Sequence, residues 1–326
     1  MISKRIVEEV KPGFCKYDVM IEDWLFKLVR FRSEPKLKVP VIVSYAFINR
    51  PYILDLHERV SVIKKMLEAG LDVWLVDWGY PKRADRYLHL SDYVDFIDRS
   101  VKFVKDETGV EAVTLHGYCL GSTLSVIYSA THPENVKNLV LQAPPINFHT
   151  SNTLAVWARS IEPEKIVRAL GNATGDLLNL SFLLVDPIRL IVGKYQGLLD
   201  NIQNEKFVRD FLYMDYWIFD SPAIPGGVYV EYIRRWYKNN EVLNGRFTYR
   251  GKKVKIENIT MPVLVLVAEK DHITPPDAVR EFFDRIPSKD KKMLLSDKGH
   301  IGLTVSGKSH REMWPEAIRW VVERSG

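Results

Sequence analysis

The sequence has few cysteines and no long apolar segment at its start. Only Cys15 and Cys119 occur in the 326 residues, which is too few for a disulfide framework, so a reducing, cytoplasmic environment is expected. The first nine residues contain no hydrophobic core of signal-peptide length. Both absences argue against a secreted, disulfide-stabilised protein.

An excess of charge of one sign is also missing. Lys and Arg number 46 against 41 Asp and Glu, a net charge of +5, and the basic residues are scattered instead of banded. This distribution argues against a nucleic-acid partner. No internal repeat or low-complexity segment occurs. The apolar content of 46% is sufficient for a substantial core, in one large domain or two small ones.

One uncharged window approaches the length of a membrane span. Residues 112–130 contain no Asp, Glu, Lys or Arg. Glycines and a cysteine interrupt the middle of the window, which favours a buried strand followed by a buried helix over a transmembrane helix. We therefore predict no membrane span.

Strands and helices alternate over residues 39–142. Continuous apolar runs predict strands buried on both faces of a parallel sheet, and the intervening segments predict helices, so the region consists of βαβ units. Two earlier runs, 19–21 and 25–31, predict antiparallel edge strands. The expected strands are 39–45, 72–78, 113–115 and 138–142; the expected helices are 56–69, 92–108 with Ser91 as N-cap, and 124–130.

The alternation stops between residues 144 and 260, where amphipathic segments are separated by prolines. We interpret this region as a helical cap, or lid, over the ligand-binding edge of the sheet; a second helical domain is the alternative. The alternation resumes with a strand at 261–268, a helix at 275–286, a strand at 293–295 and a last helix at 311–323. The predicted division is a first core part at 1–143, which includes the N-terminal edge segment, a cap at 144–260 and a second core part at 261–326.

A Gly-x-Cys-x-Gly motif follows the strand that ends near Leu115. Cys119 is flanked by Gly117 and Gly121, and this pattern is typical of a sharp strand-to-helix turn that leaves no room for a Cβ beside a nucleophile. The N-terminus of the following helix favours both a thiolate and an oxyanion. The alternative is a buried structural thiol.

Two further candidates follow the last two predicted strands. Asp271 comes after the strand at 261–268, and His300 comes after the strand at 293–295. Nucleophile, acid and histidine in this order are typical of the α/β-hydrolase fold, in which ligands bind at the carboxyl ends of the strands. We predict that His300 accepts the thiol proton of Cys119 and that Asp271 orients His300. His272 is interpreted as a surface histidine.

The oxyanion of the tetrahedral intermediate requires backbone donors. The N–H of Leu120 is the first expected donor, and the second comes from the loop after the first core strand, at Phe47 or Ile48. We take Ile48 as the prediction, although the sequence does not choose between the two. No metal site and no cofactor are expected.

A cysteine nucleophile suits acyl transfer from a thioester. Attack of a thiol on a thioester produces another thioester, so the acyl group stays activated for the next acceptor, whereas a serine would form a more stable oxygen ester. Such an enzyme must exclude water, and a helical cap serves that purpose. Some hydrolases also use cysteine.

From Pro40 onward, the chain resembles the catalytic subunit of the two-subunit (class III) polyhydroxyalkanoate synthases. The departure from the family pattern is Ser122, where a second glycine is usual, and we expect a packing adjustment there and not lost activity. The segments that carry the resemblance are residues 46–56, 77–81, 117–121, 217–222, 268–272 and 299–308.

The resemblance implies that Cys119 carries the growing acyl chain, that His300 activates Cys119, and that Asp271 helps to activate the hydroxyl that extends the chain. Asp271 therefore has two candidate roles. The implied substrate is a short-chain (R)-3-hydroxyacyl coenzyme A, and coenzyme A is released as a product. The implied partners are a second, non-catalytic subunit, another copy in a homodimer, and the surface of cytoplasmic polyester granules. Basic candidates for the coenzyme A phosphates are Arg50, Lys82, Arg83, Arg86, Arg234 and Arg235.

Two other classes compete with the polymerase. A Cys-dependent hydrolase or thioesterase of the same fold would transfer the acyl group to water. A non-enzymatic granule-surface protein would not need Cys119, Asp271 and His300 together, and their presence counts against this class.

Overall fold

The computed structural model describes residues 10, 12–185 and 192–326. The N-terminal segment on which the signal-peptide prediction depends, residues 1–9, lies outside the described residues, as does 186–191 of the predicted cap. An eight-stranded sheet forms the centre of the molecule, in the order β1-β2-β4-β3-β5-β6-β9-β10. Its strands are β1 (Tyr17–Glu22), β2 (Lys27–Phe31), β3 (Val41–Ser44), β4 (Val73–Asp77), β5 (Val113–Tyr118), β6 (Val136–Gln142), β9 (Val263–Ala268) and β10 (Lys291–Ser296).

The sheet is parallel from β4 to β10. Strands β1 and β2 are antiparallel to their neighbours and form one edge, as predicted from their alternating pattern. Strands β3 and β9 are buried along their whole length, as continuous apolar runs require when both faces are covered. The register places Ser44 of β3 beside Gly117 of β5, so the loop after β3 emerges next to the Gly-x-Cys-x-Gly turn.

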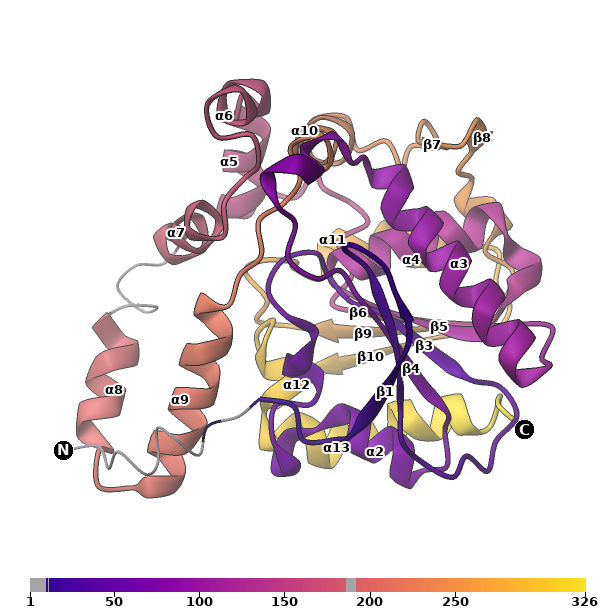
Figure 1. Cartoon of the computed structure of the whole chain (residues 1–326), viewed down its shortest axis with the longest axis horizontal. Helices are drawn as coiled ribbons and strands as arrows, with labels where there is room; N and C mark the ends of the chain where they lie inside the picture. The colour runs from indigo at the N-terminus through magenta and orange to yellow at the C-terminus, as the bar shows by residue number, and fades with distance from the viewer. Residues whose placement is uncertain (1–9, 11, 186–191) are drawn as a thin grey trace.

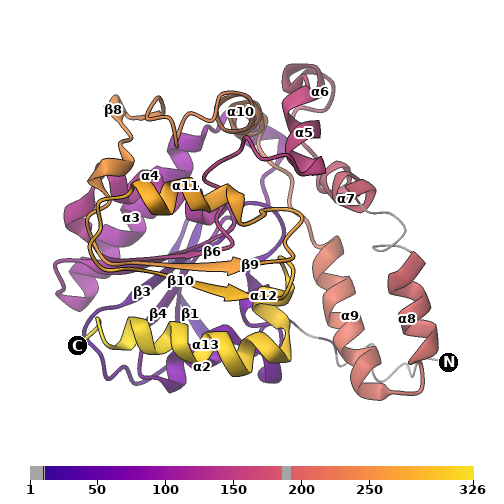
Figure 2. The same cartoon turned by 180° about the vertical axis from the view of Figure 1, so that it is seen from behind.

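Helices cover both faces of the sheet (Figures 1 and 2). In both views α3, α4 and α11 lie on one face, and α2 and α13 lie on the other. The short α12 lies near the carboxyl ends of β9 and β10 (Figure 2). This arrangement confirms the predicted α/β-hydrolase fold. The bounds are α2 (Val62–Glu68), α3 (Leu90–Thr108), α4 (Leu120–Thr131), α11 (Asp277–Arg285), α12 (Gly302–Val305) and α13 (Gly307–Val322).

Several predicted helix starts were wrong. Helix α2 begins at Val62, because the Ser61 side chain accepts a hydrogen bond from the N–H of Lys64 and caps the helix there. Helix α3 begins at Leu90, so Ser91 is not the N-cap; the Asp92 carboxylate accepts from the N–H of His89 at 2.7 Å and fixes the earlier start.

The cap region is mostly helical, as predicted. The pair α8 and α9 projects beyond the carboxyl ends of the strands, on the side toward which the arrows of β9 and β10 point (Figure 2). The sequence did not predict the small hairpin of β7 (Thr248–Tyr249) and β8 (Lys252–Lys253). The cap helices are α5 (Thr153–Ser160), α6 (Pro163–Leu170), α7 (Gly175–Val185), α8 (Lys194–Asp200), α9 (Glu205–Phe219) and α10 (Gly226–Glu231), followed by a π-helical turn at Tyr232–Lys238.

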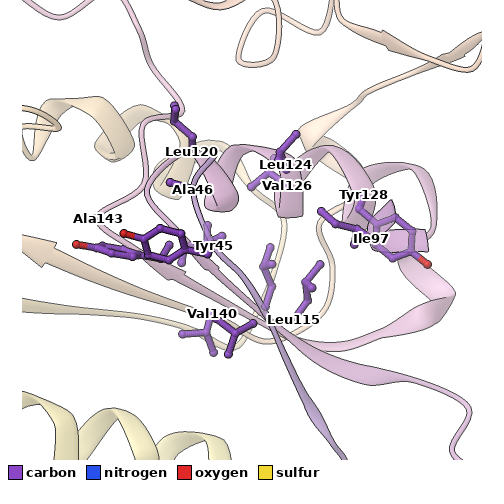
Figure 3. Packing of buried hydrophobic residues seen from close by; sticks show 14 of the residues in the cluster. Tyr45, Ala46, Ile97, Leu115, Leu120, Leu124, Val126, Tyr128, Val140 and Ala143 are labelled. Atoms are coloured by element: carbon purple, nitrogen blue, oxygen red, sulfur yellow. The ribbon is translucent and has the colours of Figure 1, made fainter. Parts of the chain in front are cut away.

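Buried apolar side chains surround α4 and the strands beneath it (Figure 3). Leu120 and Leu124 of α4, like Leu115 and Val140 on the strands beneath, are at most 2% exposed. Each such side chain contributes about 1.5–3 kcal/mol of hydrophobic stabilisation when fully buried. The core therefore holds α4, and with it the cysteine at its N-terminus, firmly against β5. Residues 112–130, the uncharged window, form parts of β5 and α4.

Among the described residues, no helix combines the length and apolarity that are needed to cross a bilayer.

Candidate active site

Cys119 occupies a strained turn between β5 and α4. Its backbone angles are φ 52° and ψ −122°, a conformation that a non-glycine residue adopts only where the surroundings impose it. The N–H of Cys119 donates to the carbonyl of Gln142 on β6 at 2.8 Å. The turn has the geometry that the Gly-x-Cys-x-Gly motif predicted.

The two glycines of the motif are required by close backbone contacts. A Cβ on Gly117 would lie 2.4 Å from Cα of Ser122, and a Cβ on Gly121 would lie 2.0 Å from the carbonyl oxygen of Ser44. Neither neighbour is a flexible side-chain end, so the turn itself would have to move. Helix α4 therefore begins in direct contact with the end of β3.

Ser122, the departure from the family pattern, is incorporated in the same turn. Its side chain is fully buried, and its hydroxyl lies 2.8 Å from the carbonyl oxygen of Gly117 and 3.3 Å from that of Gln142. The additional Cβ is accommodated on the helix side, and the hydroxyl ties α4 to the strand that precedes the cysteine.

His300 and Asp271 form a buried pair at the ends of β10 and β9. The ring Nδ1 of His300 lies 2.7 Å from Oδ2 of Asp271, and the two side chains are 7% and 0% exposed. The ring of Tyr118, the residue before the cysteine, stacks on the imidazole with 5.6 Å between centroids. With Nδ1 directed at Asp271, Nε2 is the imidazole atom left for the cysteine.

Thr274 completes this pair, and sequence reasoning missed it. Its hydroxyl lies 2.8 Å from Oδ2 of Asp271, and its backbone N–H donates to Oδ1 at 2.8 Å. The N–H of Ile273 also donates to Oδ1 at 2.8 Å. A Thr three residues after an Asp is common in loops, so the sequence carried no specific signal.

The charges of the pair stabilise each other. Burial opposes the protonated form of His300, but the negative charge of Asp271, together with the interactions of the ring with Tyr118 and Cys119, outweighs burial and holds the pKa of His300 well above its ordinary value. Burial likewise opposes the charged form of Asp271, and the attraction of His300 together with the hydrogen bonds from Thr274 lowers the pKa of that carboxyl below its ordinary value. The site therefore stabilises the imidazolium that forms when His300 accepts a proton, and it keeps Asp271 a carboxylate at neutral pH.

Cys119 and His300 line the same cavity, of about 450 Å³. The cavity lies at the carboxyl ends of the strands, and three cap helices contribute to its wall. His272, interpreted from the sequence as a surface histidine, also lines it. The cap side chains in the wall are Asn179, Phe182, Leu183 and Val185 of α7, Lys194 of α8, and Trp217 and Ile218 of α9.

The predicted oxyanion donors differ in their surroundings. Leu120 is the first residue of α4, where an N–H has no acceptor within the helix. Ile48 lines the cavity, whereas the ring of Phe47 packs edge-on against Tyr93 and Tyr232 in the core. These contacts favour the loop at Ile48, and its role as an oxyanion donor stays a prediction, as do the catalytic roles of Cys119, Asp271 and His300.

The basic residues considered for the coenzyme A phosphates do not line this cavity. Arg50 is instead paired with Asp77 at 2.7 Å and lies over the ring of Tyr80. Of the described Lys and Arg side chains, Lys194 lines the cavity; the sequence did not single it out, and it donates to Asp215 at 2.5 Å. Within the described ranges, no cluster of three or more His, Cys, Asp or Glu side chains is placed to hold a metal ion.

The chain is similar to proteins of one fold class over most of its length. Residues 52–305 match the family model described as alpha/beta hydrolase fold. Among solved structures, a monoglyceride lipase variant from Saccharomyces cerevisiae superposes with a TM-score of 0.63 at 13% identity, covering 98% of each chain. A putative lipase from Sulfolobus solfataricus has a TM-score of 0.61 at 14% identity, with 99% of this chain and 98% of that chain covered. At these identities the likeness establishes the fold.

Relatives found by sequence identify the family within this fold. The poly(3-hydroxyalkanoate) polymerase subunit PhaC of Allochromatium vinosum is 41% identical over 92% of this chain and 85% of that protein. The PhaC subunit of Haloferax mediterranei is 39% identical over 98% of this chain, which spans 66% of that relative's length. The chain therefore belongs to the poly(3-hydroxyalkanoate) polymerase family, within the α/β-hydrolase superfamily.

Proposed function

We propose that this chain is a polyester synthase that transfers short-chain (R)-3-hydroxyacyl groups from coenzyme A to a growing chain held on Cys119. The observation that carries the proposal is a cysteine, at a nucleophile turn, that shares a cavity with the buried His300–Asp271 pair. Membership of the polymerase family supports the proposed substrate class.

In the first step, the sulfur of Cys119 attacks the thioester carbonyl of the substrate. His300 removes the thiol proton, and the carbonyl oxygen becomes an oxyanion that accepts hydrogen bonds from the backbone at Leu120 and Ile48. The carbon–sulfur bond to coenzyme A then breaks, and the imidazolium of His300 returns its proton to the departing thiolate. The products are free coenzyme A and an acyl thioester on Cys119.

In the second step, the hydroxyl oxygen of another hydroxyacyl group attacks the thioester on Cys119. An ester bond forms, the bond between the acyl carbon and Cys119 breaks, and the hydroxyl proton passes through His300 to the departing thiolate of Cys119. The lengthened chain returns to Cys119 by a further thioester exchange. Cys119, His300 and Asp271 thus serve both steps.

We assign the proton of the extending hydroxyl to His300 and not to Asp271. Each carboxylate oxygen of Asp271 already accepts two hydrogen bonds. Oδ1 accepts from the backbone N–H groups of Ile273 and Thr274, and Oδ2 accepts from the Thr274 hydroxyl and the His300 ring. The Asp271 side chain has no exposed surface. A substrate hydroxyl would have to displace one of these bonds, which supports the orienting role for Asp271 over the activating one.

The cap favours transfer to a hydroxyacyl group over transfer to water. Phe182, Leu183 and Ile218 present apolar side chains to the cavity, and an apolar wall lowers the concentration of water beside the acyl thioester. No cofactor is needed, because the thioester supplies the free energy for each bond.

We further propose, from family membership, that a second, non-catalytic subunit raises the activity, that the chain forms homodimers, and that it acts at the surface of cytoplasmic polyester granules. The test of the dimer is light scattering after gel filtration, which should give twice the chain mass of 37.7 kDa.

The activity is tested by incubating the purified chain with (R)-3-hydroxybutyryl coenzyme A, with and without a candidate second subunit. The assay measures released coenzyme A, insoluble polyester and free hydroxy acid separately. Polyester as the main product supports the proposal, and Cys119→Ala should abolish both coenzyme A release and polyester. Free acid without polyester would instead identify a Cys-dependent hydrolase.

A further inference from the structure

The side chain of Asn49 connects the predicted oxyanion loop to the end of a cap helix. Asn49 directly follows Ile48, and its φ of 59° is in the left-handed region. Its Nδ2 lies 2.6 Å from Oγ of Ser221 and 3.2 Å from the carbonyl oxygen of Ile218. The side chain therefore leaves its own loop and bonds to the C-terminal end of α9.

The next residue makes a second connection to the same helix. The indole N–H of Trp217 donates to the carbonyl of Arg50 at 2.8 Å. Ser221 extends the connection to α7, because its hydroxyl lies 2.7 Å from Oδ1 of Asn179. Three of these side chains, Asn49, Trp217 and Asn179, also line the cavity that contains Cys119.

Two tyrosines fix the residue that follows α9. The hydroxyls of Tyr52 and Tyr80 donate to the two carboxylate oxygens of Asp220 at 2.8 and 2.7 Å. Burial and the nearby carboxylate raise the pKa of Tyr80 to about 12, and the same two causes raise that of Tyr52. Both hydroxyls therefore stay protonated and remain donors at neutral pH.

An asparagine satisfies two requirements at position 49. Among residues with a side chain, Asn is one of the few that tolerate a positive φ. The last carbonyls of an α-helix also lack intrahelical donors, and the carboxamide N–H groups supply them from another part of the chain. A Gly at position 49 would keep the backbone conformation and remove the donor.

We infer that Asn49 is a positioning residue for the acyl-transfer reaction: it aligns the backbone at Ile48 as an oxyanion donor only while α9 is docked against the loop. This inference rests on the proposed function of the site. An oxyanion donor stabilises the transition state only when it is held in place beforehand. The contacts of Asn49 thus couple the position of the cap to the chemical competence of Cys119.

The test compares Asn49→Gly with the wild type in two reactions of Cys119. The first is the single-turnover release of coenzyme A from (R)-3-hydroxybutyryl coenzyme A, which proceeds through an oxyanion. The second is alkylation by iodoacetamide, which forms no oxyanion. We expect coenzyme A release at saturating substrate to slow by about tenfold or more, with alkylation unchanged or faster.

Unchanged coenzyme A release would overturn the inference, and so would an equal slowing of both reactions, because that pattern indicates general damage to the site. Asn240→Gly is the matched control. Asn240 also has a positive φ, of 49°, and its Nδ2 bonds to Oδ1 of Asn147 at 2.9 Å, away from the cavity-lining residues. It should release coenzyme A at close to the wild-type rate.

Ser221→Ala tests the partner in the same connection. Alone it should slow coenzyme A release, and in the Asn49→Gly background its effect should be smaller, because the contact between Asn49 and Ser221 is already lost there and only the bond to Asn179 remains to be removed. Additive effects would contradict the inference. Both a polymerase and a hydrolase release coenzyme A in the first step. A wild-type chain that formed only free acid would therefore refute the proposed polymerase, and the comparison of Asn49→Gly with the wild type could still be interpreted.

Discussion

Nδ1 of His300 and Oδ2 of Asp271 are 2.7 Å apart at a position where neither side chain has appreciable contact with solvent. A charged pair of this kind is stable only because each charge compensates the burial of the other. If one partner is removed, burial should therefore shift the pKa of the other in the direction opposite to its shift in the wild type.

For Asp271→Asn we predict that the pKa of His300 falls from well above its ordinary value of 6.5 to below it, because burial remains and the attraction of the carboxylate is lost. The measurement is a pH titration by NMR with ¹³C-labelled histidine. His116 is an internal control, since burial lowers its pKa to about 4 and the substitution does not touch it. An unchanged titration of His300 would refute the electrostatic account of the pair.

The same pair should make the stability dependent on pH. The raised pKa of His300 contributes stability that is complete below 6.5 and is lost as the pH rises through the folded-state value. The lowered pKa of Asp271 contributes stability that is complete above 3.8 and is lost as the pH falls through its folded-state value. The difference in free energy of unfolding between wild type and Asp271→Asn, measured in urea, should be largest between these limits and should decrease on either side.

The two cysteines should differ sharply in reactivity. Burial, and the nearby charge of Asp55, raise the pKa of the Cys15 thiol to about 12, so almost no thiolate forms there at neutral pH. Cys119 is at a helix N-terminus beside the His300 imidazolium. We predict that iodoacetamide labels Cys119 and not Cys15 in the folded chain, as read by peptide mass spectrometry. Both should be labelled in urea, and preferential labelling of Cys15 without urea would contradict the assignment of the nucleophile.

Gly121→Ala should damage both the turn and the activity. The new Cβ would lie 2.0 Å from the carbonyl oxygen of Ser44, and relief of this contact must move α4 or β3, at a cost of about 3 kcal/mol in the free energy of unfolding. Gly197→Ala is the matched control, because no atom of the described residues outside its own helix lies within 4 Å of the new Cβ, and it should stabilise α8 by about 0.5–1 kcal/mol. Urea denaturation and coenzyme A release are the measurements, and equal behaviour of the two variants would be inconsistent with the packing described.

Ser122→Ala should cost stability but little activity. It removes a buried hydroxyl that lies 2.8 Å from the carbonyl of Gly117, and the loss of one such bond lowers the free energy of unfolding by about 1 kcal/mol. Coenzyme A release should stay within about threefold of the wild type, since the hydroxyl faces the strand. A hundredfold decrease would instead place the Ser122 hydroxyl in the reaction.

Local sequence patterns predicted much of the core correctly. The apolar runs that became β3, β4 and β9 could be recognised because a parallel strand must be apolar on both faces. The turn at Cys119 could be predicted because backbone atoms leave no room for a Cβ at Gly117 or Gly121, and the positions of Asp271 and His300 could be predicted because each follows a strand. Helix starts were less predictable: α3 begins at Leu90 because His89, and not Ser91, is the N-cap, and its N–H donates to the Asp92 carboxylate.

The contacts between distant segments could not be read from the chain. Thr274 supports His300, and Asn49 bonds to Ser221, 172 residues away, only because the fold brings several loops to one edge of the sheet. A hydrogen bond of this kind leaves no periodic or spacing signal, since its two ends are constrained by geometry and not by their neighbours in sequence. The sequence by itself determined that Cys119, Asp271 and His300, the predicted nucleophile, acid and histidine, each follow a strand of the sheet. The tertiary structure decided which cap side chains line the cavity and how Asp271 is saturated, because both depend on packing between parts of the chain that are far apart.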